Sequence, residues 1–224
     1  MHRSGTSCLT GCLSDSGLNL GSVSESNKHN KKGNQENKEV FKLNESLLNF
    51  NHGGWKNPPL KPLTWNKELE IERNIVLSYY NELPKPWGIK DPRMLLTYNF
   101  WENHLPQHQL IGTIRHPVAV AQSLLARKHK NLSMPVEQAY HLWKIYNEAL
   151  IYIHKQKKFP IINFDLNHTT YLKKINKIRN DFDMNTESEI DFFDNHLVNQ
   201  NCYSRDECPQ NLLPLYDKLL DACI

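Results

Sequence analysis

Two short stretches of this chain carry residues of the kind that bind a phosphate or sulfate group. The first is Arg3-Ser4-Gly5-Thr6-Ser7, and it comes directly before apolar residues at helical spacing, positions 8, 9, 12 and 13. Backbone N–H groups at a helix start bind anions, and a glycine lets the backbone approach the ligand closely. The hydroxyls add donors, and Arg3 adds a planar, permanently charged group. The stretch therefore predicts an anion site, although a hydroxyl-rich helix cap is the structural alternative.

The anion is not expected to be held as in nucleoside-triphosphate-binding proteins. Their loop has the pattern GxxxxGK[ST], and no such lysine follows Gly5 and no glycine precedes it at the required spacing. A nucleoside or nucleotide kinase, which also needs a carboxylate for magnesium, is therefore a disfavoured reading.

The second stretch lies about a hundred residues further along the chain. Residues 110–114 are apolar and rich in β-branched types, which predicts a buried strand. Pro117 suits the first position of a helix, so the strand is expected to turn into a helix at Arg115-His116-Pro117. Arg115 then lies at the carboxyl edge of a strand, where ligands bind in open α/β sheets. Ser123 follows on the helix face that points back to this start, so Arg115 and Ser123 are expected to hold one phosphate. The alternative is an arginine that caps the sheet edge and a solvated serine.

Together the two stretches resemble motifs of the sulfotransferases that use 3′-phosphoadenosine 5′-phosphosulfate (PAPS). Residues 3–7 look like the 5′-phosphosulfate loop of that family, and Arg115 and Ser123 look like its 3′-phosphate site. The segment Trp87–Arg93 lies between them and contains Lys-Asp-Pro, as the protein-tyrosine and bacterial members do at this place. The matches follow the order of the family, and the similarity extends over residues 1–180.

The resemblance also implies catalytic roles. Arg3 stands where the family has a cation against the bridging oxygen of the leaving phosphate, and Lys90 where a lysine supports the transferring group. The segment Gly33–Asn37 is similar to a G-x-x-E-N pattern, so Glu36 is the first candidate for the general base and Asp91 the second. Glu36 is also what capping of the next helix would place there, and Asp91 is more readily assigned to holding Lys90 or Arg93. The scheme requires no metal.

The implied activity is transfer of a sulfuryl group from PAPS to a hydroxyl on a glycan, lipid-linked sugar, peptide or small alcohol. The implied fold is α/β, a parallel sheet flanked by helices and related to P-loop nucleotide kinases. A truncated, inactive relative that binds nucleotide or a partner without turnover is the main alternative. A buried strand normally precedes a phosphate loop, whereas this chain begins inside the motif, so the first strand is expected to be missing.

Length and composition fit one domain, 1–224, with a bacterial cytoplasmic location expected. The chain has 224 residues, a net charge of +3 and 39% hydrophobic residues, which favours neither nucleic acid nor an anionic membrane as partner. The longest apolar stretch is too short to span a bilayer. Cys8 and Cys12 are expected in the core, and Cys202 and Cys208 either pair or stay reduced. His2 and His116 border the two motifs and are candidates for contact with the ligand.

The candidate site residues must be positioned by the secondary structure, for which the sequence predicts strands that alternate with helices. Residues 14–37 are polar and predict a mobile loop. Residues 181–224 predict a C-terminal extension that packs on the domain. Helices are expected at about 38–50, 66–83, 117–130, 135–157, 168–180 and 211–222, and strands at 87–90, 110–114 and 159–164. Residues Arg127, Lys128 and Lys130 would place positive charge at the end of their helix. Val40, Leu43, Leu47 and Phe50 would lie on one face of their helix, and Ile75, Tyr79 and Leu83 roughly on one side of theirs.

Overall fold

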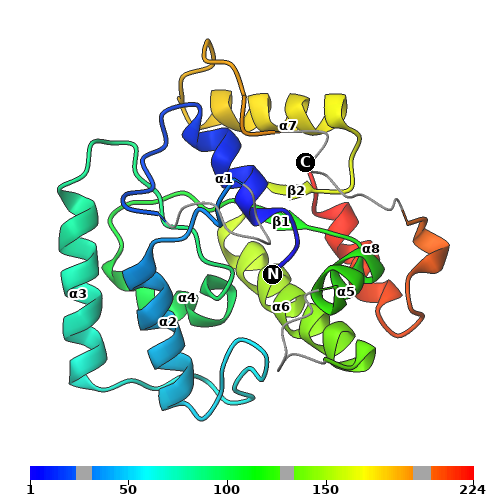
Figure 1. Ribbon diagram of the computed structural model, residues 1–224, viewed down its shortest axis with the longest axis horizontal. Coiled ribbons are helices and arrows are strands. Elements are labelled where there is room, and N and C mark those ends of the chain that lie inside the picture. Colours follow the sequence, from blue (N-terminus) through cyan, green and yellow to red (C-terminus); the bar gives the residue numbers. More distant parts are fainter. Residues whose placement is uncertain (24–31, 127–133, 194–202) are drawn as a thin grey trace.

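The computed structural model describes residues 1–23, 32–126, 134–193 and 203–224, and these have an α/β architecture. The elements in chain order are α1 (Thr6–Ser14), α2 (Lys38–Phe50), α3 (Lys67–Asn81), α4 (Met94–Trp101), the 3-10 turn η1 (Glu102–His104), β1 (Gly112–Ile114), α5 (Pro117–Leu125), α6 (Val136–Lys157), β2 (Ile161–Asn163), α7 (His168–Asp181), the 3-10 turn η3 (Arg205–Glu207) and α8 (Leu213–Asp221) (Figure 1).

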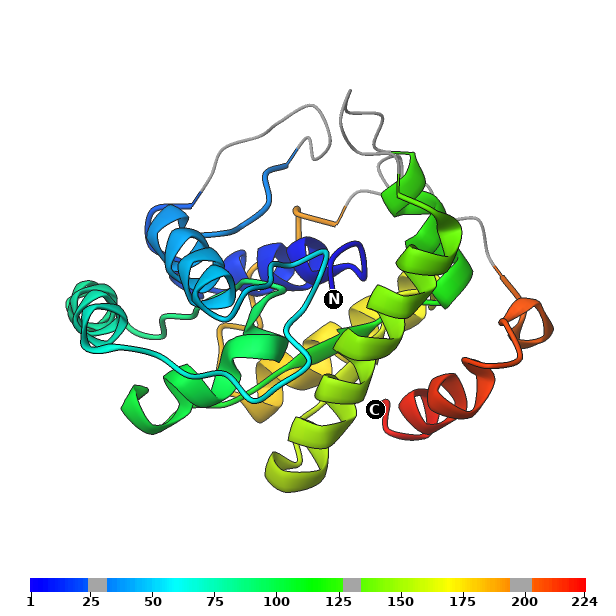
Figure 2. The same cartoon turned by 90° about the horizontal axis from the view of Figure 1, so that it is seen from below.

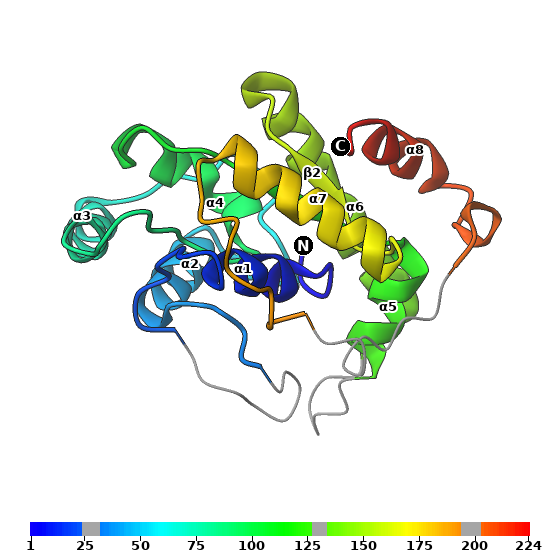
Figure 3. The same cartoon turned by 90° about the horizontal axis from the view of Figure 1, so that it is seen from above.

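A small parallel sheet lies at the centre of the molecule. Strands β1 and β2 pair with Thr113 opposite Ile162, and helices cover both faces of the pair (Figure 3). Because successive strand residues point to opposite faces, neighbouring isoleucines of β2 enter different cores. Ile161 packs with α5, α6 and α8, whereas Ile162 packs with α1 and α7. The α/β class with a parallel sheet is therefore confirmed in this coarse form.

A second group of helices, α2, α3 and α4, packs around its own apolar cluster. These helices and the pair α5 and α6 lie on opposite sides of the N-terminal segment (Figure 2). Helix α2 begins at Lys38 because Asn37 caps it, accepting from the backbone N–H groups of Glu39 and Val40. Asn66 caps α3 in the same way through Leu69 N–H. These bounds agree with the sequence expectation to within two residues.

The side of α3 that carries Ile75 and Tyr79 is not the buried one. Ile75 and Tyr79 are 65% and 41% exposed, whereas Val76 and Tyr80 are buried against α2 and α4. Apolar residues follow the helical period on both sides of α3, so the pattern offers two candidate faces. Packing of the neighbouring helices selects the other one. Phe50 of α2 is also exposed, at 45%.

The strand predicted at 87–90 is also absent. Trp87 makes one isolated parallel bridge with Asn19, and the hydrogen bonds on either side are Asn19 N–H to Pro86 O and Gly88 N–H to Asn19 O, at 2.8 and 2.9 Å. The two segments run together for one residue pair, which does not build a ladder. The predicted strands 110–114 and 159–164 are confirmed in shorter form, since pairing covers three residues of each.

Other predictions fall partly outside the described residues. This is true of loop 14–37 at residues 24–31, of Arg127, Lys128 and Lys130, and of the Cys202 half of the predicted Cys202–Cys208 pair. Within the described part, Cys12 is buried in the core, Cys8 is partly exposed and Cys208 is a free, buried thiol.

The C-terminal residues return to the sheet. Helix α8 packs on α6, with the Tyr216 ring 6.2 Å from that of Trp143. The backbone N–H of Ile224 donates to Ile161 O at 3.0 Å, which ties the end of the chain to β2. Among the described residues, none of the helices is long and apolar enough to cross a membrane.

Candidate functional site

The loop before α1 has a backbone conformation that depends on glycine. Gly5 has φ 82°, and a Cβ at this position would lie 2.3 Å from ring atoms of Phe164, so the loop can lie against this ring only with glycine present. Arg3, with φ 64°, is also left-handed. The Thr113 hydroxyl donates to Ser4 O at 2.9 Å and fastens the loop to β1. The start of α1 thus lies against the carboxyl end of the sheet.

The first turn of α1 has the properties of an anion site. No side chain among the described residues caps this helix start, so its backbone N–H groups lack the usual capping acceptor. The Ser4 side chain is fully buried, and within the described part of the chain its Oγ has no hydrogen-bond partner. A phosphate or sulfate oxygen would supply acceptors at this point.

Residues from the two predicted motifs meet beside this loop. Arg3 Nε donates to Ser123 Oγ at 2.8 Å across 120 positions of sequence. Arg115 Nη1 reaches Arg3 O at 3.4 Å. We refer to Arg3, Arg115 and Ser123, with Asp165, as the cationic cluster. The structure therefore places the loop and the strand-to-helix turn side by side, as a single ligand bound by both would require.

Asp165 is the carboxylate of this cluster. It follows β2 at the carboxyl edge of the sheet and lies 3.4 Å from Arg115 Nε, and it accepts from His116 N–H at 2.5 Å. Burial raises the pKa of Asp165, while the His116 N–H and the charge of Arg115 oppose this shift. Sequence reasoning missed Asp165, although its place directly after a strand could have identified it.

The two histidines next to the motifs are buried. His116 is the N-cap of α5, is stacked on Tyr203 at 5.4 Å between ring centroids, and packs against Tyr216. Burial lowers the pKa of His116. His2 packs against Trp55 at 4.6 Å. Both rings contact aromatic side chains, and His116 Nδ1 also accepts from Val118 N–H, so His116 caps α5 and both histidines take part in packing.

Lys90 joins the segment after residue 87 to the α1 loop. Its Nζ donates to Glu36 Oε1 at 2.6 Å, to Asn34 O at 2.7 Å and to Ser7 Oγ at 3.3 Å. The Lys90 and Glu36 side chains are 6% and 13% exposed. Burial lowers the pKa of Lys90, and the Glu36 carboxylate opposes that shift. The predicted lysine and the predicted base are thus brought together at the first turn of α1.

Arg93 lies beyond Lys90 and contacts the carboxylates of Glu36, Asp91 and Glu45. Asp91 Oδ1 accepts from the Arg93 backbone N–H at 2.8 Å and from its Nη1 at 3.0 Å. Arg93 Nε pairs with Glu45, and its Nη1 lies 4.0 Å from Glu36 Oε2. Asp91 therefore holds Arg93, the role favoured for it over that of base. We refer to Lys90, Arg93, Glu36, Asp91 and Glu45 as the compensated cluster.

The site residues expected from sequence thus converge from two sides on the start of α1. Glu45 was missed because a glutamate in the middle of a helix carries no local signal. The described residues include no group of three or more His, Cys, Asp or Glu arranged to hold a metal. No family model matches the chain, and the searches of curated proteins and of solved structures find no significant similarity either.

Proposed function

We propose that this protein is a PAPS-dependent sulfotransferase with a P-loop-nucleotide-kinase-like α/β fold. The observation that carries the proposal is the meeting of Arg3 with Ser123, at 2.8 Å, and with Arg115, through its main-chain oxygen. A donor with one phosphate on the ribose and a phosphosulfate at the other end needs two anion subsites within the span of one nucleoside. The cationic cluster and the α1 start supply two adjacent subsites of that kind.

The two arginines of the cationic cluster support binding of an anion. Arg3 Nε donates to the Ser123 hydroxyl, and Arg115 lies 3.4 Å from Asp165, whose pKa is raised by burial. A phosphate beside these guanidinium groups would form hydrogen bonds between charged partners, which are the stronger kind. In this proposal Arg115 and Ser123 hold the 3′-phosphate, and Ser4, Gly5, Thr6 and Ser7 hold the phosphosulfate.

Transfer would proceed in line at sulfur. The bond from sulfur to the bridging oxygen of the phosphate breaks, the acceptor oxygen bonds to sulfur, and the electron pair stays on the leaving phosphate. Arg3 and Lys90 would stabilise the charge that develops on the phosphosulfate oxygens. Glu36 would take the proton of the acceptor hydroxyl, since its carboxylate lies one hydrogen bond from Lys90.

The finer expectations belong to the same proposal: a hydroxyl-bearing acceptor as the partner, no nucleic acid, no metal, and action in a bacterial cytoplasm. A nucleotide-binding relative without turnover is distinguished from the enzyme by the experiment below.

The test combines binding with turnover. Adenosine 3′,5′-bisphosphate, the donor without its sulfuryl group, should bind in calorimetry, and radiolabelled PAPS should be consumed. Glu36→Gln should leave bisphosphate affinity unchanged and lower kcat by about 100- to 10,000-fold, the usual range for loss of a general base. Glu39→Gln is the matched control, because Glu39 lies nearby on α2 and is exposed, at 62%.

Each other outcome has a definite meaning. Binding without donor consumption would assign the inactive relative, and phosphorylation with ATP would assign a kinase. If the bisphosphate does not bind, the proposal is overturned. Full turnover in Glu36→Gln would remove Glu36 from its role.

A further inference from the structure

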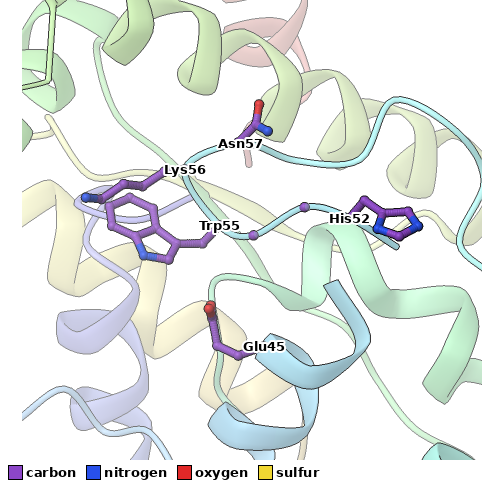
Figure 4. A pocket seen from close by; sticks show the side chains of 7 residues that line it. Glu45, His52, Trp55, Lys56 and Asn57 are labelled. Atoms are coloured by element: carbon purple, nitrogen blue, oxygen red, sulfur yellow. The ribbon is translucent and has the colours of Figure 1, made fainter. Parts of the chain in front are cut away.

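A pocket opens between α2 and the turn that follows it. It has a volume of about 440 Å³ and is lined by Glu45 and residues 52–57. Figure 4 shows Glu45 pointing from the helix towards the turn, while Trp55 and Lys56 extend together to one side and His52 points away. Neither motif of the sequence includes this turn.

The pocket adjoins the proposed transfer centre on two sides. The Trp55 ring lies 4.6 Å from that of His2, the residue before Arg3. Glu45 pairs with Arg93, whose Nη1 is 4.0 Å from the Glu36 carboxylate. The pocket therefore lies next to the N-terminal segment through Trp55 and next to the compensated cluster through Glu45.

Backbone contacts hold the turn in place. Gly54 N–H donates to Asn57 O at 3.0 Å and Asn57 N–H donates to Gly54 O at 3.2 Å. The Tyr146 hydroxyl donates to Trp55 O at 3.1 Å, and Gln138 Nε2 donates to Lys56 O at 3.3 Å. These bonds from α6 fix the backbone of Trp55 and Lys56, and the Trp55 ring lies against His2 of the N-terminal segment.

The two charged side chains that line the pocket, Glu45 and Lys56, differ in their ion pairs. Glu45 is paired with Arg93. Lys56 makes no ion pair with any residue that the structure describes, and its Nζ lies 5.5 Å from the centre of the Trp55 ring. An aromatic ring beside an ammonium group suits a ligand that has both a flat C–H surface and a negative charge.

We propose that this pocket binds the acceptor, and that the acceptor is an acidic sugar: a pyranose whose carboxylate meets Lys56 and whose C–H face lies on Trp55. The inference rests on the proposed sulfotransferase function and gives it a substrate class. Glu45, which lines the pocket, would provide a polar partner for the ring hydroxyls.

Binding to the pocket can be measured without any donor. The probes are methyl glucuronide and methyl glucoside, which differ in one carboxylate. Titration of the full chain, followed by the NMR signal of the Trp55 indole N–H and assigned with Trp55→Phe, should show about tenfold tighter binding of the glucuronide, as expected for one charged hydrogen bond. Lys56→Gln should abolish that preference and keep the glucoside affinity.

Lys61→Gln is the matched control, because Lys61 is exposed on the same connection and does not line the pocket. It should retain the preference. Equal affinities for the two sugars, or a titration that leaves the Trp55 signal unmoved, would overturn the inference.

Turnover with PAPS separates this inference from the proposed function. Methyl glucuronide should be sulfated about tenfold more efficiently than the glucoside and than hydroxyphenylacetate, an acidic phenol, and Lys56→Gln should remove this advantage. Consumption of PAPS with the phenol as the better acceptor would overturn the acidic-sugar assignment alone. A failure of the bisphosphate to bind would overturn the proposed function and the acceptor role with it.

Discussion

The two charged clusters beside α1 differ in the contacts that the described residues give their cations. In the cationic cluster, Arg3 donates to the Ser123 hydroxyl and Arg115 lies 3.4 Å from the carboxylate of Asp165. In the compensated cluster, Lys90 and Arg93 pair with three carboxylates, Glu36, Asp91 and Glu45. The second cluster is therefore the one in which described ion pairs tie both cations to buried or partly buried carboxylates.

This difference indicates separate tasks for the two clusters. Removing a buried cation that pairs with carboxylates leaves those carboxylates uncompensated, so such a cation acts mainly on stability. An arginine beside the proposed anion loop would pair with a ligand phosphate, so it acts mainly on affinity. The comparison therefore predicts that cations of the compensated cluster affect stability first, and those of the cationic cluster affect ligand affinity first.

The largest effect is expected on removal of Arg93. Arg93→Gln should lower the free energy of unfolding by about 3–5 kcal/mol, the usual cost of leaving buried partners uncompensated. Urea denaturation measures this loss. Arg205→Gln is the control, because its pair with Asp217 is exposed, 55% and 37%, and such surface pairs contribute little to stability. Equal losses in the two variants would contradict the comparison.

Removal of Arg115 should act chiefly on the ligand. Arg115→Ala should weaken binding of adenosine 3′,5′-bisphosphate by about 100-fold, since one charged pair that is largely desolvated contributes roughly 2–3 kcal/mol. Calorimetry measures this change. Arg115→Lys should recover part of the affinity, because a lysine keeps the charge and loses the planar pair of donors. An unchanged affinity in Arg115→Ala would place the 3′-phosphate elsewhere.

Ser123 should have a smaller effect on the same affinity. Ser123→Ala removes the hydroxyl that accepts from Arg3 Nε at 2.8 Å. The bisphosphate should bind about 10-fold more weakly, the lower end for loss of one hydrogen bond to a charged group. Ser78→Ala, on the exposed face of α3, should leave the affinity unchanged. A loss as large as that of Arg115→Ala would show that Ser123 also shapes the loop.

The smallest effect concerns pH and Asp165. Burial raises the pKa of Asp165 above its ordinary value of 3.8, so the folded protein binds more protons at this group than the unfolded chain does in the interval above 3.8. The contribution of Asp165 to stability is therefore highest below that value and falls as the pH rises towards the raised pKa. Asp165→Asn keeps an acceptor for His116 N–H and should remove this contribution. The check is to denature both proteins at several pH values from acid to neutral. The unfolding free energy of the wild type minus that of the variant should decrease as the pH rises. A difference that increases with pH would contradict the direction of the shift.

The sequence by itself determined the local features of this protein. The helix starts at Asn37 and Asn66 follow from capping chemistry, which involves neighbouring residues only. The glycine loop before α1 and the strand-to-helix turn at Arg115-His116-Pro117 could also be predicted from neighbouring residues alone. The α/β class followed from short β-branched runs that alternate with helical periods.

Tertiary structure decided which of these features meet. Ion pairs such as Lys90 with Glu36 join residues 54 positions apart, and their partners follow no local period. The buried face of α3 depended on α2 and α4, because either side of that helix offered apolar residues. The isolated bridge at Trp87 shows the same limit, since a strand exists only where a second segment pairs with it. The pocket beside Glu45 was beyond sequence reasoning for this reason: Glu45, Trp55 and His2 come together only when α2, the turn and the N-terminal segment pack against one another.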